Sequence, residues 1–438
     1  MKKISTFAAL LLMAAAAMFS TSCENDNINP YDYVNNGSNG SDENQGSKDV
    51  ITTKVAEYPA GSVVWTKDTT LSQSVEIPVG ASLYIEPGVT VTCKSEVQVP
   101  VEIVVLGNLY CMGTAEKPVT ITSDTKKPAD WGGIICGYNS EEVVLNHVDV
   151  AYAGATPTES SASFQNKLFK TTIDGGVPAF HFCNVNGKFV MANSFFHDNY
   201  NDQTYFTGGN GVIINNNFAD SGNAADGGEA INVKAGCKLD VANNIIYNAC
   251  TNAFKLSNAG NSEVIPLSEM TAYNNTIVNC GWRRSKNKKG GSVWVEKAAK
   301  PVFVNNLIYD SRFGLKQPKK DGADMEHSRL TPNYYFASTE TGVAQMAKGA
   351  GVVDDVVGYI ELATCLHVDG LAAIGCISAI GKDIVDNHAV TTGKVSLVVV
   401  VVMEETVGHH KLAVYITEVE GWHTAIDGGL EKFVLERS

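Results

Sequence analysis

Short apolar segments joined by asparagine recur between Phe189 and Lys316. The repeated units read F-V-M-A-N-S-F-F-H-D (189–198), V-I-I-N-N-N-F-A-D (212–220), D-V-A-N-N-I-I-Y-N (240–248), T-A-Y-N-N-T-I-V-N (271–279) and V-F-V-N-N-L-I-Y-D (302–310). Each unit holds an apolar strand, an asparagine and a second apolar strand. The marker asparagines Asn193, Asn216, Asn244, Asn275 and Asn306 are spaced 23, 28, 31 and 31 residues apart, and Asn146 is an earlier, weaker copy. This period predicts a solenoid.

A third apolar piece follows a loop in each unit. These pieces are Phe180 with Phe182, Tyr205 with Phe206, Ile231 with Val233, Phe254 with Leu256, Val293 with Val295, and Phe313 with Leu315. Three short strands with no helix between them can pair only with their copies in the next unit, which builds three parallel sheets around one core. The sequence therefore predicts an all-β parallel β-helix. We expect the marker asparagine at a bend between two sheets, because asparagine tolerates left-handed backbone and its amide can bond to the next rung.

The repeat pattern sets the limits of this predicted domain. From Val50 to Asp124 apolar and polar residues alternate between glycine and proline, as in half-buried strands, so we expect the β-helix to span residues 50–350. Residues 351–438 lack the markers and contain five consecutive valines between Lys394 and Met403. An exposed valine run would template aggregation, so this part is expected to be a C-terminal cap, with a divergent tail as the alternative.

The N-terminus has the pattern of an export signal. Lys2 and Lys3 precede an apolar run from Phe7 to Phe19, which is too short to cross a bilayer as a mature helix. Residues 1–23 are therefore predicted to be a signal peptide. Residues 24–49 are rich in Asn, Gly, Ser and Asp and are predicted to be a flexible linker.

The end of this signal resembles those of bacterial lipoproteins. Small residues directly before Cys23 are similar to that family, which implies that Cys23 carries a lipid. Glu24 and Asp26 resemble the export tag of surface lipoproteins in the Bacteroidetes group. The resemblance implies a protein anchored by lipid in the outer membrane and exposed at the cell surface. A soluble protein that faces the periplasm is the alternative.

Three phrases near the start of the predicted solenoid resemble a second family. They are L-Y-I-E-P-G-V-T-V (83–91), G-N-L-Y-C-M-G-T-A-E-K-P-V-T-I-T-S-D (107–124) and D-W-G-G-I-I-C-G (130–137). They look like the opening turns of bacterial cell-surface right-handed β-helix proteins of the pectate-lyase-like superfamily, and the similarity covers roughly residues 50–338. The resemblance implies a right-handed parallel β-helix. It says little about activity, because the phrases belong to the scaffold.

Charge and cysteine content narrow the function further. The formal net charge of -14 disfavours binding to nucleic acid, because neutralising phosphates needs positive charge. We expect the protein to be a monomer. Apart from Cys23, nine cysteines remain, with no C-x-x-C pair, and most are expected to fill the core. Cys250 and Cys280 lie six and five residues past their marker asparagines. Since rungs stack about 4.8 Å apart, this pair is a candidate disulfide.

Variable loops follow the second strand of each unit. They are residues 199–203, 221–228, 250–252, 280–291 and 311–312. Solenoid geometry places such loops on one edge, where they form a continuous surface. One of them, D-S-G-N-A-A-D-G-G-E (220–229), offers Asp220, Asn223, Asp226 and Glu229 as oxygen ligands for Ca²⁺. The alternative is a solvated acidic loop, since the spacing does not match an EF-hand.

The same edge suggests glycan binding. Trp282 can stack on a sugar ring beside Tyr200, while Arg283, Arg284 and Lys286 hold a carboxylate or sulfate. We therefore expect a cell-surface lipoprotein that binds a polysaccharide along its loop edge. In the alternative reading the basic loop 282–289 is only a solubilising surface segment.

Two other functions stay open. A polysaccharide lyase would use Lys286 or Arg284 as its base, and a glycoside hydrolase would need paired carboxylates such as Asp220 and Asp226. The chain lacks the R-x-P-x-x-R phrase of pectate lyases, so the expectation leans against an enzyme. A passive surface scaffold is the second alternative.

Overall fold

The structure is a computed structural model that describes residues 58–168, 173, 175–223, 227–285, 290–318, 320–330 and 333–346, and the backbone of five later strands. The predicted signal peptide, Cys23 and the linker lie outside the described residues. Among the described residues, no helix is both long and apolar enough to cross a membrane.

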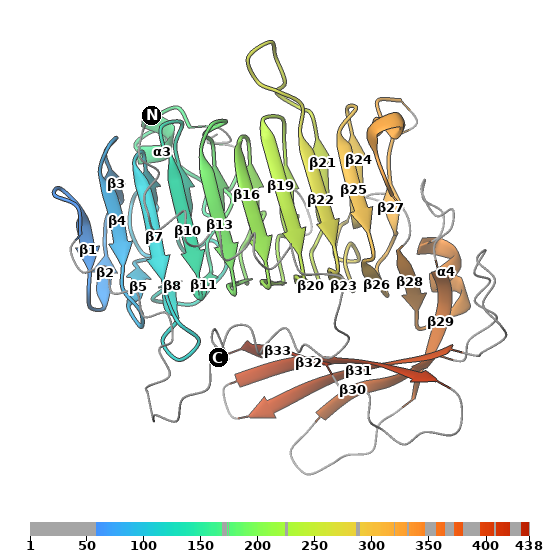
Figure 1. Cartoon of the computed structure of the whole chain (residues 1–438). Coiled ribbons are helices and arrows are strands. Elements are labelled where there is room, and N and C mark those ends of the chain that lie inside the picture. Colours follow the sequence, from blue (N-terminus) through green and yellow to red (C-terminus); the bar gives the residue numbers. More distant parts are fainter. Residues whose placement is uncertain are drawn as a thin grey trace, which may run out of the picture. The chain divides into compact units, whose positions relative to one another are not determined.

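Three strands per turn repeat along the chain and build three sheets, which we name A, B and C (Figure 1). Sheet A contains β1 (Val63–Trp65), β4 (Ser82–Ile85), β7 (Asn108–Met112), β10 (Glu142–Asn146), β13 (Lys188–Ala192), β16 (Gly209–Ile214), β19 (Cys237–Ala242), β22 (Glu269–Tyr273) and β25 (Lys300–Val304). Each strand pairs in parallel with the equivalent strand of the next turn, as β16 does with β19. One turn of three strands is called a rung below.

Sheets B and C follow the same rule. Sheet B contains β2 (Thr69–Leu71), β5 (Thr90–Cys93), β8 (Val119–Ser123), β11 (Val148–Ala151), β14 (Phe195–His197), β17 (Asn217–Ala219), β20 (Ile245–Tyr247), β23 (Thr276–Val278), β26 (Leu307–Tyr309) and β28 (Tyr334–Ala337). Sheet C contains β3 (Val75–Ile77), β6 (Ile103–Val105), β9 (Ile134–Cys136), β12 (Phe180–Phe182), β15 (Thr204–Phe206), β18 (Ile231–Val233), β21 (Asn252–Ser257), β24 (Gly291–Glu296) and β27 (Leu315–Lys316). The predicted right-handed parallel β-helix is confirmed.

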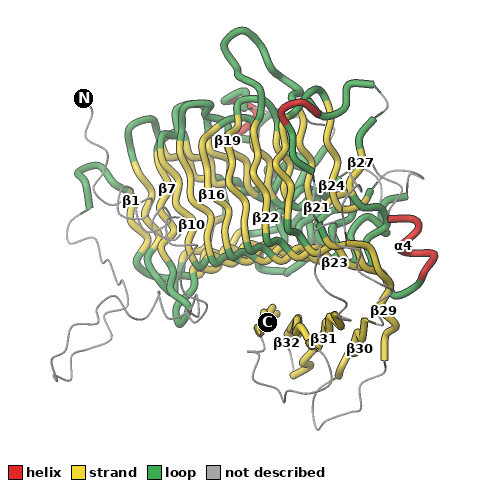
Figure 2. The backbone as a smooth tube through the Cα atoms, turned by 45° about the vertical axis from the view of Figure 1, so that its right-hand side comes forward, coloured by secondary structure: helices red, strands yellow, loops and turns green. Residues whose placement is uncertain are grey.

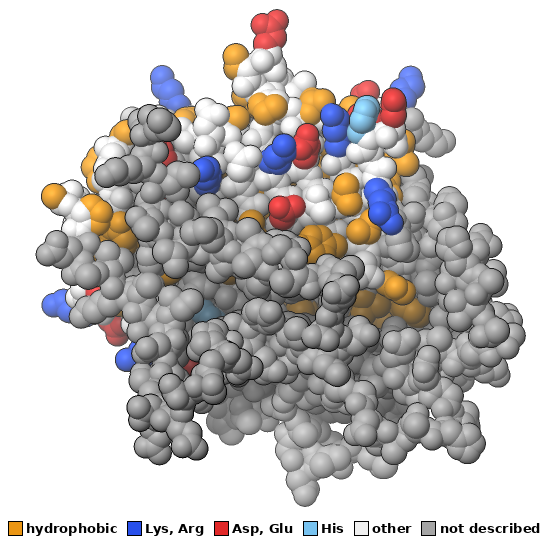
Figure 3. All heavy atoms as spheres, in the orientation of Figure 1, with side chains coloured by type: hydrophobic (Ala, Val, Ile, Leu, Met, Phe, Trp, Pro, Cys, Tyr) orange, Lys and Arg blue, Asp and Glu red, His pale blue; other side chains and the backbone are white. Residues whose placement is uncertain are grey.

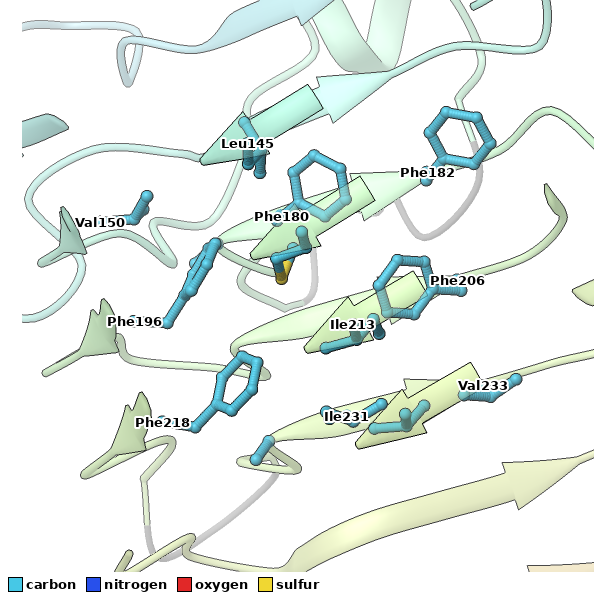
Figure 4. Packing of buried hydrophobic residues seen from close by; sticks show 14 of the residues in the cluster. Leu145, Val150, Phe180, Phe182, Phe196, Phe206, Ile213, Phe218, Ile231 and Val233 are labelled. Atoms are coloured by element: carbon cyan, nitrogen blue, oxygen red, sulfur yellow. The ribbon is translucent and has the colours of Figure 1, made fainter. Parts of the chain in front are cut away.

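The core is a stack of equivalent apolar side chains. Phe196 of β14 lies over Phe218 of β17, with ring centroids 5.6 Å apart and the rings stacked (Figure 4). Phe180 and Phe206, both fully buried, bring a second aromatic pair from sheet C. Because each strand alternates inward and outward residues, only one side of each sheet supplies this core. The side chains on the other side of each sheet point away from this core.

Two consecutive asparagines have different roles at the corner between sheets A and B. The first, at Asn215, Asn243, Asn274 and Asn305, is exposed and has φ between 55° and 57°. This is the left-handed region that asparagine tolerates better than most residues. The second residue of each doublet is buried. The first asparagine therefore makes the bend, and the second faces the neighbouring rungs.

The second asparagines form a continuous ladder through Asn216, Asn244, Asn275, Asn306 and Asn333. From Asn244 onward, the Oδ1 atom of each accepts hydrogen bonds from the backbone N–H and the Nδ2 of the asparagine one rung earlier, at 2.9–3.0 Å. Each Nδ2 also donates to a backbone carbonyl of the preceding rung, as Asn244 does to Ile213. The predicted single file of asparagines is confirmed. It aligns the rungs from β13 to β28 in the same phase.

Asn193 is a correction to the predicted markers. It has φ 52°, so it belongs to the bend-forming column, and Ser194 occupies the ladder position, where its N–H donates to Asn216 Oδ1 at 2.9 Å. The first spacing along the ladder is therefore 22 residues. The sequence pattern misled because Asn193 precedes a serine, whereas the later units have two asparagines in a row.

The candidate disulfide is also corrected. Cys250 and Cys280 are both free thiols. Backbone bonds align Cys280 with Ala249 and align Cys250 with Gly281, so the two cysteines are offset by one position. A one-residue offset turns a side chain to the other face of a strand. Cys280 packs in the core, while the Cys250 thiol donates to the carbonyl of Asn223 in a loop.

The C-terminal part of the chain changes pattern. The helix α4 (Glu340–Met346) follows β28, and the amide of Gly314 donates to Met346 O. Strand β29 (Val356–Ala363) pairs in parallel with β28, and then β30 (Ala372–Ala379), β31 (Val395–Thr406), β32 (His409–Glu420) and β33 (Glu431–Arg437) follow in antiparallel order. The backbone of the valine run in β31 pairs with β30 and β32. The C-terminal cap stays a prediction.

Outer faces and loops carry a mixture of charges. Figure 3 shows Lys and Arg interspersed with Asp and Glu over the coloured part of one face. On sheet A, for example, Lys238 Nζ lies 3.2 Å from Glu269 Oε2. The tube in Figure 2 shows that the loop between β21 and β22 projects beyond its neighbours. Its tip carries Val264, which is 84% exposed. A short 3₁₀ helix, η1 (Met325–His327), lies in a later connection.

Candidate functional site

The predicted loop edge exists. Every one of the five loops leaves a strand of sheet B and enters a strand of sheet C, so neighbouring loops meet along what we call the BC edge. Each loop begins with a left-handed residue. These residues are Asp198, Asp220, Asn248, Asn279 and Asp310, with φ between 44° and 56°. Asp and Asn at these positions thus serve first as corner residues.

The predicted calcium ligands have separate partners. Asp220 Oδ1 accepts a hydrogen bond from Asn248 Nδ2 at 2.6 Å, and Asn223 Nδ2 donates to the Tyr200 carbonyl at 3.2 Å. Glu229 Oε1 accepts from Asn252 Nδ2 at 3.3 Å. Asp226 lies outside the described residues. Within the described ranges, no group of three His, Cys, Asp or Glu side chains is arranged to hold a metal ion. Calcium binding stays a prediction.

Two aromatic side chains of the predicted glycan site are exposed on the BC edge. Tyr200 is 41% exposed and Trp282 is 49% exposed. The indole N–H of Trp282 donates to the Asp310 carbonyl at 2.6 Å, which fixes the ring between neighbouring loops. An aromatic ring held in this way offers an apolar face without a large entropic cost on binding.

The adjacent arginines differ in role. Arg283 braces the edge: Nη2 donates to the carbonyls of Ser221 and Asn248 at 2.7 Å, and Nη1 donates to Gly222 O at 3.0 Å. Its fork is therefore occupied. Arg284 is buried, with Nε and Nη1 unpartnered in the part of the chain that the structure describes. Lys286 lies outside the described residues.

A second set of functional candidates lies on the outer face of sheet C. In strands β12, β15, β18, β21 and β24 an outward side chain stands between two residues whose side chains turn toward the core. The outward residues are His181, Tyr205, Asn232, Lys255, Trp294 and, in β27, Lys316, and register places each next to the following one. We call this file of polar and aromatic side chains the C column. It runs beside the BC edge.

The earlier rungs of sheet C have a different outer face. There Val104 and Ile135 point outward and pack against Leu168 and Val177 from the segment that contains α3 (Ala162–Gln165). The buried Glu102 carboxylate anchors this segment by accepting hydrogen bonds from the N–H and Oγ of Ser163 at 2.9 and 2.6 Å. The outward residues thus change from apolar to polar between β9 and β12. This change marks where the covering segment gives way to the C column.

A buried acid pair adjoins the start of the C column. Asp202 Oδ1 accepts from the amides of Gly228 and Glu229 at 2.9 Å, and Oδ2 accepts from Asn232 Nδ2 at 2.8 Å. Burial alone would raise the pKa of Asp202, but hydrogen bonds from Glu229, Asn232 and the two amides lower it. Burial, together with the negative charge of Asp202, raises the pKa of Glu229 to about 8. The pair therefore shares one proton near neutral pH.

Lys234 completes this buried cluster. Its Nζ donates to Asn232 Oδ1 at 2.6 Å and stands 5.1 Å from the centroid of the Tyr205 ring. Burial lowers the pKa of Lys234 to about 7, with the nearby Lys255 charge acting in the same direction. A carboxyl group and an amine that both titrate near neutrality are typical of acid–base sites.

The later half of the C column is only half-buried. Trp294 lies between Lys255 and Lys316 in register, and its indole N–H donates to Glu296 Oε2 at 2.7 Å. Lys255 Nζ lies 3.8 Å from Glu296 Oε1, and Lys316 Nζ lies 3.7 Å from the centroid of the Phe313 ring. An accessible indole flanked by two ammonium groups is suited to a sugar ring that carries hydroxyl or acidic substituents.

Sequence reasoning missed the C column for a definite reason. The apolar pairs that defined the third strand, such as Phe180 with Phe182 and Ile231 with Val233, are the inward residues, and the residue between them was passed over. Period-2 alternation is the signal that finds it, because the residue between two inward side chains must point outward.

Comparison with known proteins agrees with the fold. The three parallel sheets and the asparagine ladder define a parallel β-helix protein. Residues 57–166 match the family model described as Pectate-lyase like beta helix domain. The matched segment covers the early rungs and α3, and the C column from His181 onward lies beyond it. No curated protein and no solved structure matches the chain.

Proposed function

We propose that the protein binds a glycan along the C column and the BC edge. The observation that carries the proposal is the half-buried end of the C column, in which Lys255, Trp294 and Lys316 stand on successive rungs. Rungs repeat about every 4.8 Å, so a linear polymer laid along the helix axis meets a hydrogen-bonding or stacking group at each of these three rungs. A pectate-lyase-like domain in residues 57–166 is compatible with glycan binding or processing.

The proposal includes a lipid anchor. The charged start, short apolar run and Cys23 of the N-terminal sequence support export and lipidation. A linker of residues 24–49 would hold the β-helix away from an outer-membrane surface. Mass spectrometry of the mature protein tests this part, since an N-terminal cysteine carrying acyl chains is expected, and an unmodified terminus elsewhere would contradict it.

Titration of the purified protein with neutral and acidic oligosaccharides, followed by calorimetry, tests glycan binding. We expect Trp294→Ala to weaken the best ligand at least about tenfold, because it removes the stacking surface. Tyr273→Ala is the matched control, since Tyr273 is a half-buried outward aromatic of sheet A in the same rung. Absence of binding to every glycan, or equal losses in both variants, would refute the proposal.

The buried cluster favours an enzyme as a second candidate. Glu229 and Lys234, whose pKa values burial moves toward neutrality, are suited to exchange protons with a substrate. Asp202 and Glu229 share a hydrogen bond, so they are too close to act as the separated acid and nucleophile of a retaining glycosidase. Release of unsaturated or reducing ends from acidic glycans, abolished by Lys234→Met, would favour the enzyme over a pure binding protein.

A further inference from the structure

Arg284 is a buried arginine of the BC edge. Its side chain and backbone together are 8% exposed, and the Nε and Nη1 atoms have no hydrogen-bond partner among the described residues. Arginine stays protonated inside proteins, so its charge cannot be relieved by loss of a proton. Burying such donors unpaired costs stability. A group that carries this cost is expected to have a partner outside the chain.

The neighbouring arginines lack this property. Arg283 spends its guanidinium on the carbonyls of Ser221, Gly222 and Asn248. Arg312 Nη1 donates to the Arg284 carbonyl at 2.9 Å, so it supports the backbone of Arg284. No ion pair within 4.0 Å is formed by Arg284 across the described ranges. Arg283 and Arg312 thus have hydrogen-bond partners, whereas the Nε and Nη1 atoms of Arg284 have none among the described residues.

The surroundings of Arg284 suit a ligand on the BC edge. Trp282, two residues earlier, presents an exposed ring that is tied to Asp310 O. On the preceding rung Cys250 is buried, and both arginines exert their positive charge on its thiol. The arrangement combines an apolar platform with a positive, poorly solvated donor, which strengthens a charge-assisted hydrogen bond.

We propose that Arg284 anchors an oxyanion-binding site on the BC edge, which accepts a carboxylate or sulfate group carried by the glycan. The inference rests on the proposed function and deepens it, since it names the charged substituent that the ligand must bear. The guanidinium group matches planar and tetrahedral oxyanions better than an ammonium does. Arg283 holds the loops that shape the site, and Trp282 lies beside the sugar.

Thermal melting with simple anions tests the site without any glycan. In sodium chloride alone, Arg284→Met is expected to melt above the wild type, because the variant no longer buries an unpaired charge. In sodium sulfate or sodium acetate of equal ionic strength, the wild type is expected to gain a few degrees in saturable fashion. Arg284→Met is expected to show only the small, non-saturating rise that excluded salts give to any protein.

Each alternative outcome of the melting experiment is decisive. If Arg284→Met melts below the wild type in chloride, or does not fold, Arg284 has partners within the chain and the inference fails. If both proteins respond equally to sulfate and to acetate, the anion effect is general and the inference fails. Arg284→Lys keeps the charge and loses the planar fork, so we expect it to retain less than half of the saturable gain.

A second experiment separates the two proposals. The full-length protein is titrated with a neutral, a uronate-bearing and a sulfated oligosaccharide of equal length. We expect at least a tenfold preference for one acidic form, reduced to near unity by Arg284→Met, and the preferred form identifies carboxylate or sulfate as the natural group. Equal affinity for all three would overturn the oxyanion site and leave the glycan proposal intact. Failure of all three to bind would overturn the glycan proposal.

Discussion

The two corners that flank sheet B differ in how much they vary from rung to rung. Between sheets A and B, residues 193–194, 215–216, 243–244, 274–275 and 305–306 make the same two-residue turn in every rung from β13 onward. Between sheets B and C, the loops 198–203, 220–230, 248–251, 279–290 and 310–314 vary in length and composition. A corner with one repeated task fixes the fold, and the corner with varied loops is available for a ligand.

Substitution at the uniform corner is expected to have the largest effect. Asn244→Leu removes the acceptor for the N–H and Nδ2 of Asn216 and the donor to Ile213 O, all within a buried ladder. Leaving several buried polar groups unpaired costs about 3–5 kcal/mol. Urea denaturation monitored by circular dichroism measures the loss. A change below about 1 kcal/mol would show that the ladder does not set the stability of the rungs.

The next largest effect concerns a residue at the start of the variable corner. His197 is 4% exposed, with Nδ1 2.7 Å from Asp198 Oδ2 and Nε2 3.0 Å from Asp149 Oδ1. Burial opposes its charged form, but the hydrogen bonds to the two carboxylates raise the pKa of His197 to about 9. A pKa shift of this size corresponds to roughly 3 kcal/mol of stabilisation of the folded protein.

The sign of this contribution follows from the raised pKa. The stabilisation is complete below about pH 6.5, where the unfolded histidine is also charged, and it is lost as the pH rises through about 9. The difference in unfolding free energy between the wild type and His197→Gln should therefore shrink between these two pH values. The difference is the useful quantity, because Glu229 and Lys234 titrate in the same range. A pH-independent difference would contradict the assignment.

A smaller effect is expected within the variable loops. Arg283→Met removes the brace between the loops that contain Ser221, Gly222 and Asn248. Because Arg283 is only half-buried, we expect a loss of about 2 kcal/mol, and protease cleavage in residues 220–230 should become faster. The A–B corner should be unaffected, which hydrogen exchange of the ladder amides can verify. Faster exchange throughout the ladder would mean that the two corners are not independent.

The smallest effect on stability is expected at Asn243, the residue directly before Asn244. Asn243 is exposed with φ 55°, a conformation that glycine adopts without strain. Asn243→Gly should therefore change the free energy of unfolding by less than about 1 kcal/mol, whereas Asn244→Gly should resemble Asn244→Leu. Urea denaturation of the two glycine variants measures how differently the two asparagines contribute to stability. Equal losses of unfolding free energy would contradict the separate roles of Asn243 and Asn244.

The sequence was sufficient to predict the fold because the fold repeats. Each copy of the asparagine doublet supports the others, and five imperfect signals in phase indicate one architecture. The errors were all of one residue: Asn193 was taken for the ladder position of Ser194, and Cys250 was placed level with Cys280. A period of several tens of residues locates a rung but not the face of a strand, and that face changes with every residue.

The site was less predictable because its residues do not repeat. The sequence grouped Arg283 with Arg284, and only the positions of three carbonyl groups distinguish the brace from the unpartnered cation. Glu229 was grouped with Asp220, yet it lies with Asp202, which follows an earlier strand. Contacts between loops on different rungs depend on loop conformation, for which the chain offers no periodic signal.

Each ladder asparagine touches only the rungs immediately before and after its own, even though successive ladder positions lie 22, 28, 31, 31 and 27 residues apart. Lengthening or replacing one BC loop therefore leaves the phase of all later turns unchanged. The molecule is in effect a display scaffold, on which loops can be exchanged one at a time while the stack of strands that carries them stays straight.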